Sequence, residues 1–191
     1  PGIPRLGIPD LQLADSAVGV ARGALHSRYS TALPSTASEA CSWDLKLAAE
    51  YGALIGRELR DQGLNMALGG GVNLMIDPRN GRNFEYKGED PILAGKIAAE
   101  DMKALKAQGV MSHIKHFALN NQETGRNIGN VVMDRRSMRE TELLAFEIAI
   151  KEADISAVMC SYNKVNGDWA CENSYLMNDF LKKAVGHKGF V

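Results

Sequence analysis

One segment, IKHFALNNQETGR, brings lysine, histidine, asparagine, glutamate and arginine together between Ile114 and Arg126. Lys115 and His116 end an apolar, strand-like stretch, and two adjacent polar side chains at such a place are difficult to bury in a core. Lys115 could serve as a desolvated amine nucleophile in a Schiff-base lyase, and Glu123 could serve as a carboxylic acid. The lyase alternative is disfavoured because a neutral lysine needs an apolar pocket. The residues near Lys115 in the sequence would instead form a hydrated polar rim: His116, Asn120, Asn121 and Glu123.

Two other polar clusters also follow strand-like stretches. Tyr162 and Asn163 come just after the apolar run 155–160, and the loop DPRNGRNFEY occupies residues 77–86. In a parallel α/β fold, chemistry gathers at the carboxyl ends of the strands, where all three clusters are expected. The glycine run at residues 69–71 has no GK[ST] signature, so we interpret it as a flexible strand exit and not as a phosphate loop.

The elements that must position these clusters alternate between helix and strand. Apolar periodicity and terminal residues predict helices at 44–62, 90–109, 137–153 and 173–185, the third opened by a capping box of Ser137 and Glu140. Strands are predicted at 64–68, 110–117 and 155–160, with another beginning at Phe190. Repeated strand–helix units favour an α/β fold with a parallel sheet, and we predict a (β/α)8 barrel. A doubly wound sheet is the alternative, but its phosphate fingerprint is missing.

The composition is that of a globular protein with a real core, since 45% of the 191 residues are hydrophobic and 24% are charged. With 22 basic and 23 acidic residues, there is no excess of positive charge for nucleic acid or anionic lipid. No apolar stretch approaches the roughly 20 residues that cross a bilayer. We therefore expect neither nucleic acid nor a membrane as a partner. The start at Pro1 and the apolar end at Val191 lead us to expect a chain cut at both ends.

Two of the three cysteines, Cys160 and Cys171, flank a turn-rich loop that could bring them together. The residues alone leave two alternatives, a disulfide or two separate small core residues. Cys41 has no evident partner, CxxC spacing is absent and the histidines are scattered, so we expect no metal site. We predict the bonded form, which requires an oxidising compartment and hence a periplasmic or secreted protein.

Beyond these patterns, the chain resembles the N-terminal barrel domain of glycoside hydrolase family 3, the β-glucosidase family. The resembling segments span nearly the whole chain: GIPRLGIPDLQLAD (2–15), TALPSTASEACSWD (31–44), DPRNGRNFEYKGEDP (77–91), IKHFALNNQETGR (114–126) and VMCSYNKVNGDWACEN (158–173). The resemblance implies that residues 1–191 are one partial (β/α)8 barrel domain. It also implies that the family's C-terminal α/β sandwich domain is absent.

The resemblance further implies which residues surround the sugar at the cleavage point: Asp15, Arg82, Lys115, His116, Arg126, Met159 and Tyr162. A carboxylate can accept hydrogen bonds from two neighbouring hydroxyls, and lysine and histidine can donate to others. The arginines would hold this set in place, and Tyr162 would present its ring to the sugar. Trp43 and Trp169 are expected to be packing residues.

The sequence departs from the family pattern in two respects. Around Asp15 it has Ser16, Ala17 and Ala21 where the pattern has Gly, Pro and Arg. The nucleophilic aspartate of the family is expected just after Val191, and the general acid in the second domain, so neither catalytic residue is expected within the chain. Retaining hydrolysis needs both carboxyl groups, about 5–5.5 Å apart.

We therefore predict a retaining β-glucosidase that hydrolyses terminal non-reducing β-D-glucosyl residues, with β-xylosidase activity left open. Its substrate would be a β-glucoside or a short β-gluco-oligosaccharide, and its carboxyl chemistry requires no cofactor. The chain would carry the sugar-binding half of the site, be inactive without the missing C-terminal part, and self-associate through an open sheet edge. The alternatives are a Schiff-base barrel lyase using Lys115 and a non-catalytic sugar-binding module.

Overall fold

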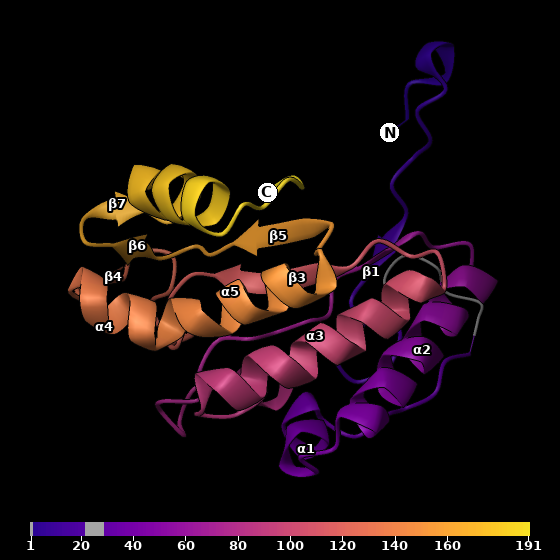
Figure 1. The fold of residues 1–191 in the computed structure, drawn as a ribbon, viewed down its shortest axis with the longest axis horizontal. Coiled ribbons are helices and arrows are strands. Elements are labelled where there is room, and N and C mark those ends of the chain that lie inside the picture. The colour runs from indigo at the N-terminus through magenta and orange to yellow at the C-terminus, as the bar shows by residue number, and fades with distance from the viewer. Residues whose placement is uncertain (1, 22–28) are drawn as a thin grey trace.

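The computed structural model describes residues 2–21 and 29–191, and its centre is a run of short parallel strands (Figure 1). The strands are β1 (Leu13–Ala14), β2 (Met66–Ala67), β3 (His113–Phe117) and β5 (Ala157–Cys160). β1 pairs with β2, and β3 pairs with β5. A parallel bridge between Met66 and Met111 joins these two pairs, and another between Ala157 and Phe190 places the segment at Phe190 beside β5. Each new strand is therefore added on the same side of the previous one. This order is that of a barrel, because a doubly wound sheet reverses direction at a switch point.

Helices connect the successive strands. They are α1 (Thr36–Cys41), α2 (Leu45–Asp61), α3 (Pro91–Ala107), α4 (Arg135–Glu140), α5 (Glu142–Ala153) and η3 (Tyr175–Ala184), the last wound as a π-helix. Two short 3-10 turns are η1 (Pro4–Leu6) and η2 (Asn83–Glu85). A small separate sheet is formed by β4 (Asn130–Val131), β6 (Lys164–Val165) and β7 (Asp168–Trp169). Within the described part of the chain, no helix combines the length and apolar character needed to span a membrane.

The two longest helices begin at side-chain caps and pack closely together. Asp44 accepts hydrogen bonds from two backbone amides at the start of α2, and Asp90 accepts one at the start of α3. α2, α3 and α5 then lie side by side along one side of the strands (Figure 1). α2 and α3 approach so closely that a Cβ added to Gly52 would lie 2.0 Å from the backbone oxygen of Asp101. Glycine is required at that crossing.

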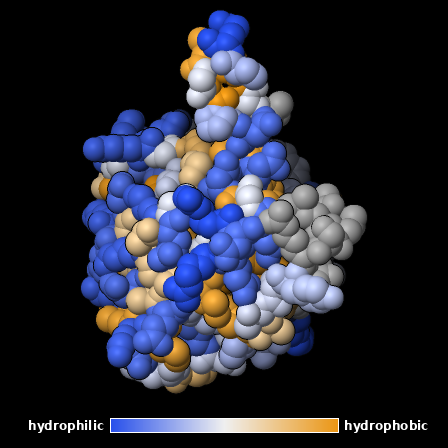
Figure 2. Space-filling model, turned by 90° about the vertical axis from the view of Figure 1, so that its right-hand side faces the viewer, coloured by the Kyte–Doolittle hydropathy of each residue, from blue (hydrophilic) through white to orange (hydrophobic). Residues whose placement is uncertain are grey.

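The face of β3 that looks away from the polar residues is covered by aromatic side chains. Phe117 lies edge-on to Phe146 of α5 at 5.1 Å and stacks with Phe180 of η3 at 5.9 Å between ring centroids. All three are almost fully buried, so this cluster attaches α5 and η3 to the strand. The N-terminal segment instead projects from the body (Figures 1 and 2), and its Ile3, Leu6 and Ile8 are exposed.

The predicted α/β class is confirmed, and the described strands form an arc of (β/α)8 type that does not close. The helices predicted at 44–62, 90–109 and 173–185 are present, as is the strand pairing at Phe190. The single helix predicted at 137–153 is wrong, because the backbone at Thr141 leaves helical geometry and separates α4 from α5. The predicted capping box is wrong too. Asp134 caps α4 by accepting from two backbone amides, Ser137 donates its hydroxyl to Asp134, and Glu140 pairs with Arg136.

Candidate active site

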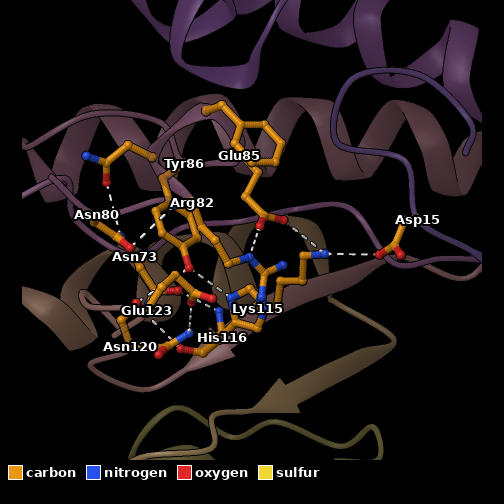
Figure 3. Close-up of polar contacts among 12 residues, drawn as sticks. Asp15, Asn73, Asn80, Arg82, Glu85, Tyr86, Lys115, His116, Asn120 and Glu123 are labelled. Carbon is orange, nitrogen blue, oxygen red and sulfur yellow. Dashed lines mark hydrogen bonds and ion pairs between the residues drawn. The ribbon is translucent and has the colours of Figure 1, made fainter. Parts of the chain in front are cut away.

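Polar side chains from several strand ends converge on the lysine of β3 (Figure 3). Lys115 is 2% exposed, and its Nζ lies 3.1 Å from Oε2 of Glu85 and 3.3 Å from Oδ1 of Asp15. The side chain of Asp15 is 67% exposed, whereas that of Glu85 is 3% exposed. An ammonium group held between two carboxylates is a charged hydrogen-bond donor and has no lone pair with which to attack a carbonyl. The geometry therefore gives no support to a Schiff-base nucleophile.

Arg82 is tied to the same buried carboxylate. Its Nε donates to Oε1 of Glu85, so one glutamate bridges Arg82 and Lys115 (Figure 3). Residues 83–85 form the turn η2, which brings Glu85 round to the lysine. Sequence reasoning missed Glu85, although it stands three residues after Arg82, the spacing at which side chains of a helical turn meet.

His116 is fixed by three hydrogen bonds from two neighbours. Its Nδ1 lies 3.0 Å from the hydroxyl of Tyr86, and its backbone N and O bond to the side-chain amide of Asn73 at 2.6 and 2.9 Å. Burial, together with the cations Arg82 and Lys115, lowers the pKa of His116 to about 2. The ring is therefore neutral at ordinary pH, and it can exchange neutral hydrogen bonds with a ligand but cannot supply a positive charge.

A local irregularity in β3 explains how two adjacent residues reach one site. In a regular strand successive side chains point to opposite faces, which would separate Lys115 from His116. Pairing with β5 shifts register between Lys115 and Phe117. Such bulges re-aim side chains and are common beside active sites. Both polar side chains are thereby presented to the site while Phe117 remains in the core.

Arg126 and Tyr162 form a second group at the same end of the strands. The guanidinium of Arg126 lies 4.8 Å from the ring centroid of Tyr162 and 2.9 Å from Oε2 of Glu123. Tyr162 is 59% exposed, so its ring is accessible to a ligand. Glu123 forms an ion pair with Arg126 and also accepts a hydrogen bond from Asn120.

Met159 of β5 is the direct neighbour of Lys115 in the strand pairing.

The structure joins Cys160 to Cys171 across a separation of 11 residues. The bond closes the loop that carries Tyr162 and Asn163, and Asn163 also donates to the backbone oxygen of Ala118. The loop is thus attached to β3 as well as to β5. Cys41 is a free, exposed thiol.

The glycine run at residues 69–71 allows close approach of three backbones and is a packed strand exit. A Cβ on Gly70 would lie 2.1 Å from the oxygen of His113, and one on Gly71 would lie 2.2 Å from the oxygen of Glu85. Our interpretation of this exit as flexible is therefore wrong. Through residues 2–21 and 29–191, no group of three or more His, Cys, Asp or Glu side chains is arranged to hold a metal ion.

Comparison with known proteins places this geometry in a family. Residues 4–191 match the glycosyl hydrolase family 3 N terminal domain. The chain belongs to this family. Members that it resembles include thermostable beta-glucosidase B of Acetivibrio thermocellus, 40% identical over 99% of this chain and 26% of the relative. Beta-glucosidase B of Emericella nidulans is 42% identical over 98% of this chain and 22% of the relative.

Solved structures of family 3 members share the fold. Beta-glucosidase 3B from Thermotoga neapolitana, in complex with alpha-D-glucose, superimposes with a TM-score of 0.95 at 37% identity. The match covers 100% of this chain and 27% of that one. The chain thus spans about a quarter of the length of the family 3 relatives that it matches.

Proposed function

We propose that this chain carries the sugar-binding part of a retaining β-glucosidase, which removes terminal non-reducing β-D-glucosyl residues from β-glucosides or short β-gluco-oligosaccharides. The observation that carries the proposal is the juxtaposition of a buried, doubly paired Lys115 with an exposed Asp15. Relatives named as beta-glucosidases, one of them solved with alpha-D-glucose, support it.

In this proposal each residue meets a different part of the sugar. Asp15 accepts hydrogen bonds from two adjacent hydroxyls, Lys115 donates a charged hydrogen bond, and neutral His116 exchanges a further one. Arg126 from the loop after β3 and Tyr162 from the loop after β5 close the site, with the exposed ring of Tyr162 offering an apolar face to the sugar. Arg82 acts from behind, by holding Glu85 against Lys115.

Bond cleavage needs two carboxyl groups that these contacts do not supply. We propose that a nucleophilic aspartate follows Val191 and that the general acid belongs to a further domain. The relatives are long enough to contain both, since this chain aligns with 22–26% of their lengths. The nucleophile would attack the anomeric carbon, the acid would protonate the leaving oxygen, and water would release the sugar in a second step.

The disulfide supports a further proposal about location. A bond between Cys160 and Cys171 persists in an oxidising compartment, so we propose a periplasmic or secreted protein. Peptide mapping without reductant, on protein recovered from each cell fraction, should find the two cysteines linked and the protein outside the cytoplasm. Free thiols at both positions after oxidising purification would contradict this.

The experiment that tests the function is an assay of the full-length protein that carries these residues, on a panel of aryl β-glycosides. We expect turnover of the β-glucoside with retained anomeric configuration, read by proton NMR, and at least about tenfold lower kcat/KM for Lys115→Ala. A preference for the β-xyloside would revise the substrate. Glucose binding without turnover would indicate a binding module, and trapping of a carbonyl substrate by borohydride would indicate a lyase.

The 191-residue chain by itself gives a second test. We expect it to hydrolyse no aryl β-glucoside and to self-associate in solution, as measured by light scattering. Turnover by the purified chain that is abolished by Lys115→Ala would show that the nucleophile lies among these residues.

A further inference from the structure

A buried ionic triad lies directly behind the loop that supplies Glu85 and Tyr86. Lys87 is 0% exposed, and its Nζ lies 2.6 Å from Oε2 of Glu39 on α1 and 3.1 Å from Oδ2 of Asp101 on α3. The three side chains come from three separate segments. No part of the sugar-binding proposal uses them.

Stability alone is a poor explanation for this triad. Two carboxylates share one ammonium, and the second oxygens, Oε1 of Glu39 and Oδ1 of Asp101, have no hydrogen-bond partner among residues 2–21 and 29–191. Burying such groups is costly, and a similar triad can often be replaced by apolar residues without loss of stability. Burial raises the pKa of Glu39 to about 7 even though Lys87 opposes the shift, which reflects that cost.

The triad instead lies at the C-terminal end of the site loop, residues 84–87, beside α1. Phe84 is 49% exposed whereas Tyr86 is fully buried, so the chain turns into the interior between these two residues. α1 contacts the loop through two residues one helical turn apart, Thr36 and Glu39. Thr36 donates to the backbone oxygens of Phe84 and Tyr86 at 3.1 and 3.2 Å, and Glu39 binds Lys87.

The loop contacts two residues of the proposed sugar site directly. Glu85 and Tyr86 immediately precede Lys87, and they contact Lys115 at 3.1 Å and His116 at 3.0 Å. A shift of residues 84–87 therefore moves the partners of both site residues at once. Asp101 is itself held in place, because α3 packs tightly against α2 at this residue, where Gly52 approaches its backbone.

We propose that the triad of Glu39, Lys87 and Asp101 is a positioning element that fixes Glu85 and Tyr86, and through them Lys115 and His116, for sugar binding. This inference rests on the proposed function. The triad touches no substrate, and its effect is on the geometry of the groups that do.

The test is a neutral replacement of the triad in the full-length protein, Glu39→Gln/Lys87→Met/Asp101→Asn. We expect a folded enzyme with KM for an aryl β-glucoside and Ki for glucose each raised at least about fivefold, and with kcat changed by less than about twofold. The matched control, Lys96→Met/Glu152→Gln, removes a partly exposed ion pair between α3 and α5 and should leave all three constants unchanged. Unchanged KM and Ki in a folded triple variant would overturn the inference.

Two further measurements keep the outcome decisive. If the triple variant does not fold, Thr36→Val removes the hydrogen bonds from α1 to the backbone of the same loop. We expect this variant to raise KM and Ki by about threefold, and no change in either constant would overturn the inference. A crystal structure of either variant should show the carboxylate of Glu85 displaced from Lys115, and an unmoved carboxylate would overturn the inference whatever the activity. An inactive wild-type enzyme would contradict the proposed function, whereas an active one with a normal triple variant would contradict only the triad's role.

Discussion

Glu85 is the charge on which the electrostatics of the site depend, because it is buried and has two cationic partners. Its carboxylate pairs with Nζ of Lys115 at 3.1 Å and with Nε of Arg82. The substitution Glu85→Gln keeps the shape of the side chain and removes its charge. Among the described residues, Asp15 is then the remaining carboxylate partner of Lys115, and its side chain is 67% exposed.

The size of the effect follows from distance and from the partners that remain. Two unit charges 3.1 Å apart, the separation of Glu85 and Lys115, attract by about 5 kcal/mol at an effective dielectric constant near 20. The measured coupling is smaller than this, because in each single variant the remaining ion can relax toward its other partner, Asp15 for Lys115 and Arg82 for Glu85. Discounting by about half for these partners, we expect a coupling free energy of about 2–3 kcal/mol between Glu85 and Lys115.

A double-mutant cycle measures this coupling directly. The protein, Glu85→Gln, Lys115→Met and the double variant are unfolded in urea, and the free energies of unfolding are compared. The control cycle uses Lys106 and Asp154, a pair whose aspartate side chain is 90% exposed, for which we expect less than about 1 kcal/mol. A coupling below about 0.5 kcal/mol for Glu85 and Lys115 would refute the electrostatic account of the site.

Three other predictions concern the scaffold. Gly52→Ala should lower the free energy of unfolding by roughly 3 kcal/mol, because the new Cβ would meet a backbone oxygen of α3 at 2.0 Å; Gly81→Ala, whose nearest contact is 3.8 Å away, is the control in the same urea titration. Replacing Cys160 and Cys171, which are separated by 11 in sequence, with serine should cost roughly 3 kcal/mol, and reductant should lower the stability of the parent but not of this variant. Burial raises the pKa of Glu142 from 4.5 to about 7, so the folded state binds the proton more tightly than the unfolded state. The stability that this carboxyl group contributes is therefore complete below pH 4.5 and lost as pH rises through 7, and Glu142→Gln should flatten the stability curve over that window.

Local sequence patterns predicted the elements of the fold well where a helix has a strong cap and clear apolar periodicity. Asp44 and Asp90 cap α2 and α3 as their sequence positions suggest. The failure at Ser137 has a local cause, since a better acceptor, Asp134, stands three residues earlier. A capping box identified by spacing alone does not decide between two competing caps.

The sequence predicted residues that gather at these strand ends, but not the network of contacts that joins them. Lys115 and His116 stand out because polar residues close an apolar stretch. Glu85 does not stand out, because its burial depends on a turn and on contact with a lysine 30 residues later in the chain. The triad partner Lys87 is hidden for the same reason, since Glu39 and Asp101 are remote in sequence.

The two carboxylates around Lys115 differ in exposure, and we therefore expect them to have different roles. Glu85 is 3% exposed and bound to two cations, so a sugar hydroxyl could reach it only by displacing one of them. The side chain of Asp15 is 67% exposed and lies 3.3 Å from the lysine, so solvent or a ligand can reach its carboxylate. A fixed inner carboxylate holds the lysine in place whether or not sugar is bound. In the proposed function, the outer one can then exchange water for sugar hydroxyl groups without leaving a buried charge unpaired, so that binding is reversible.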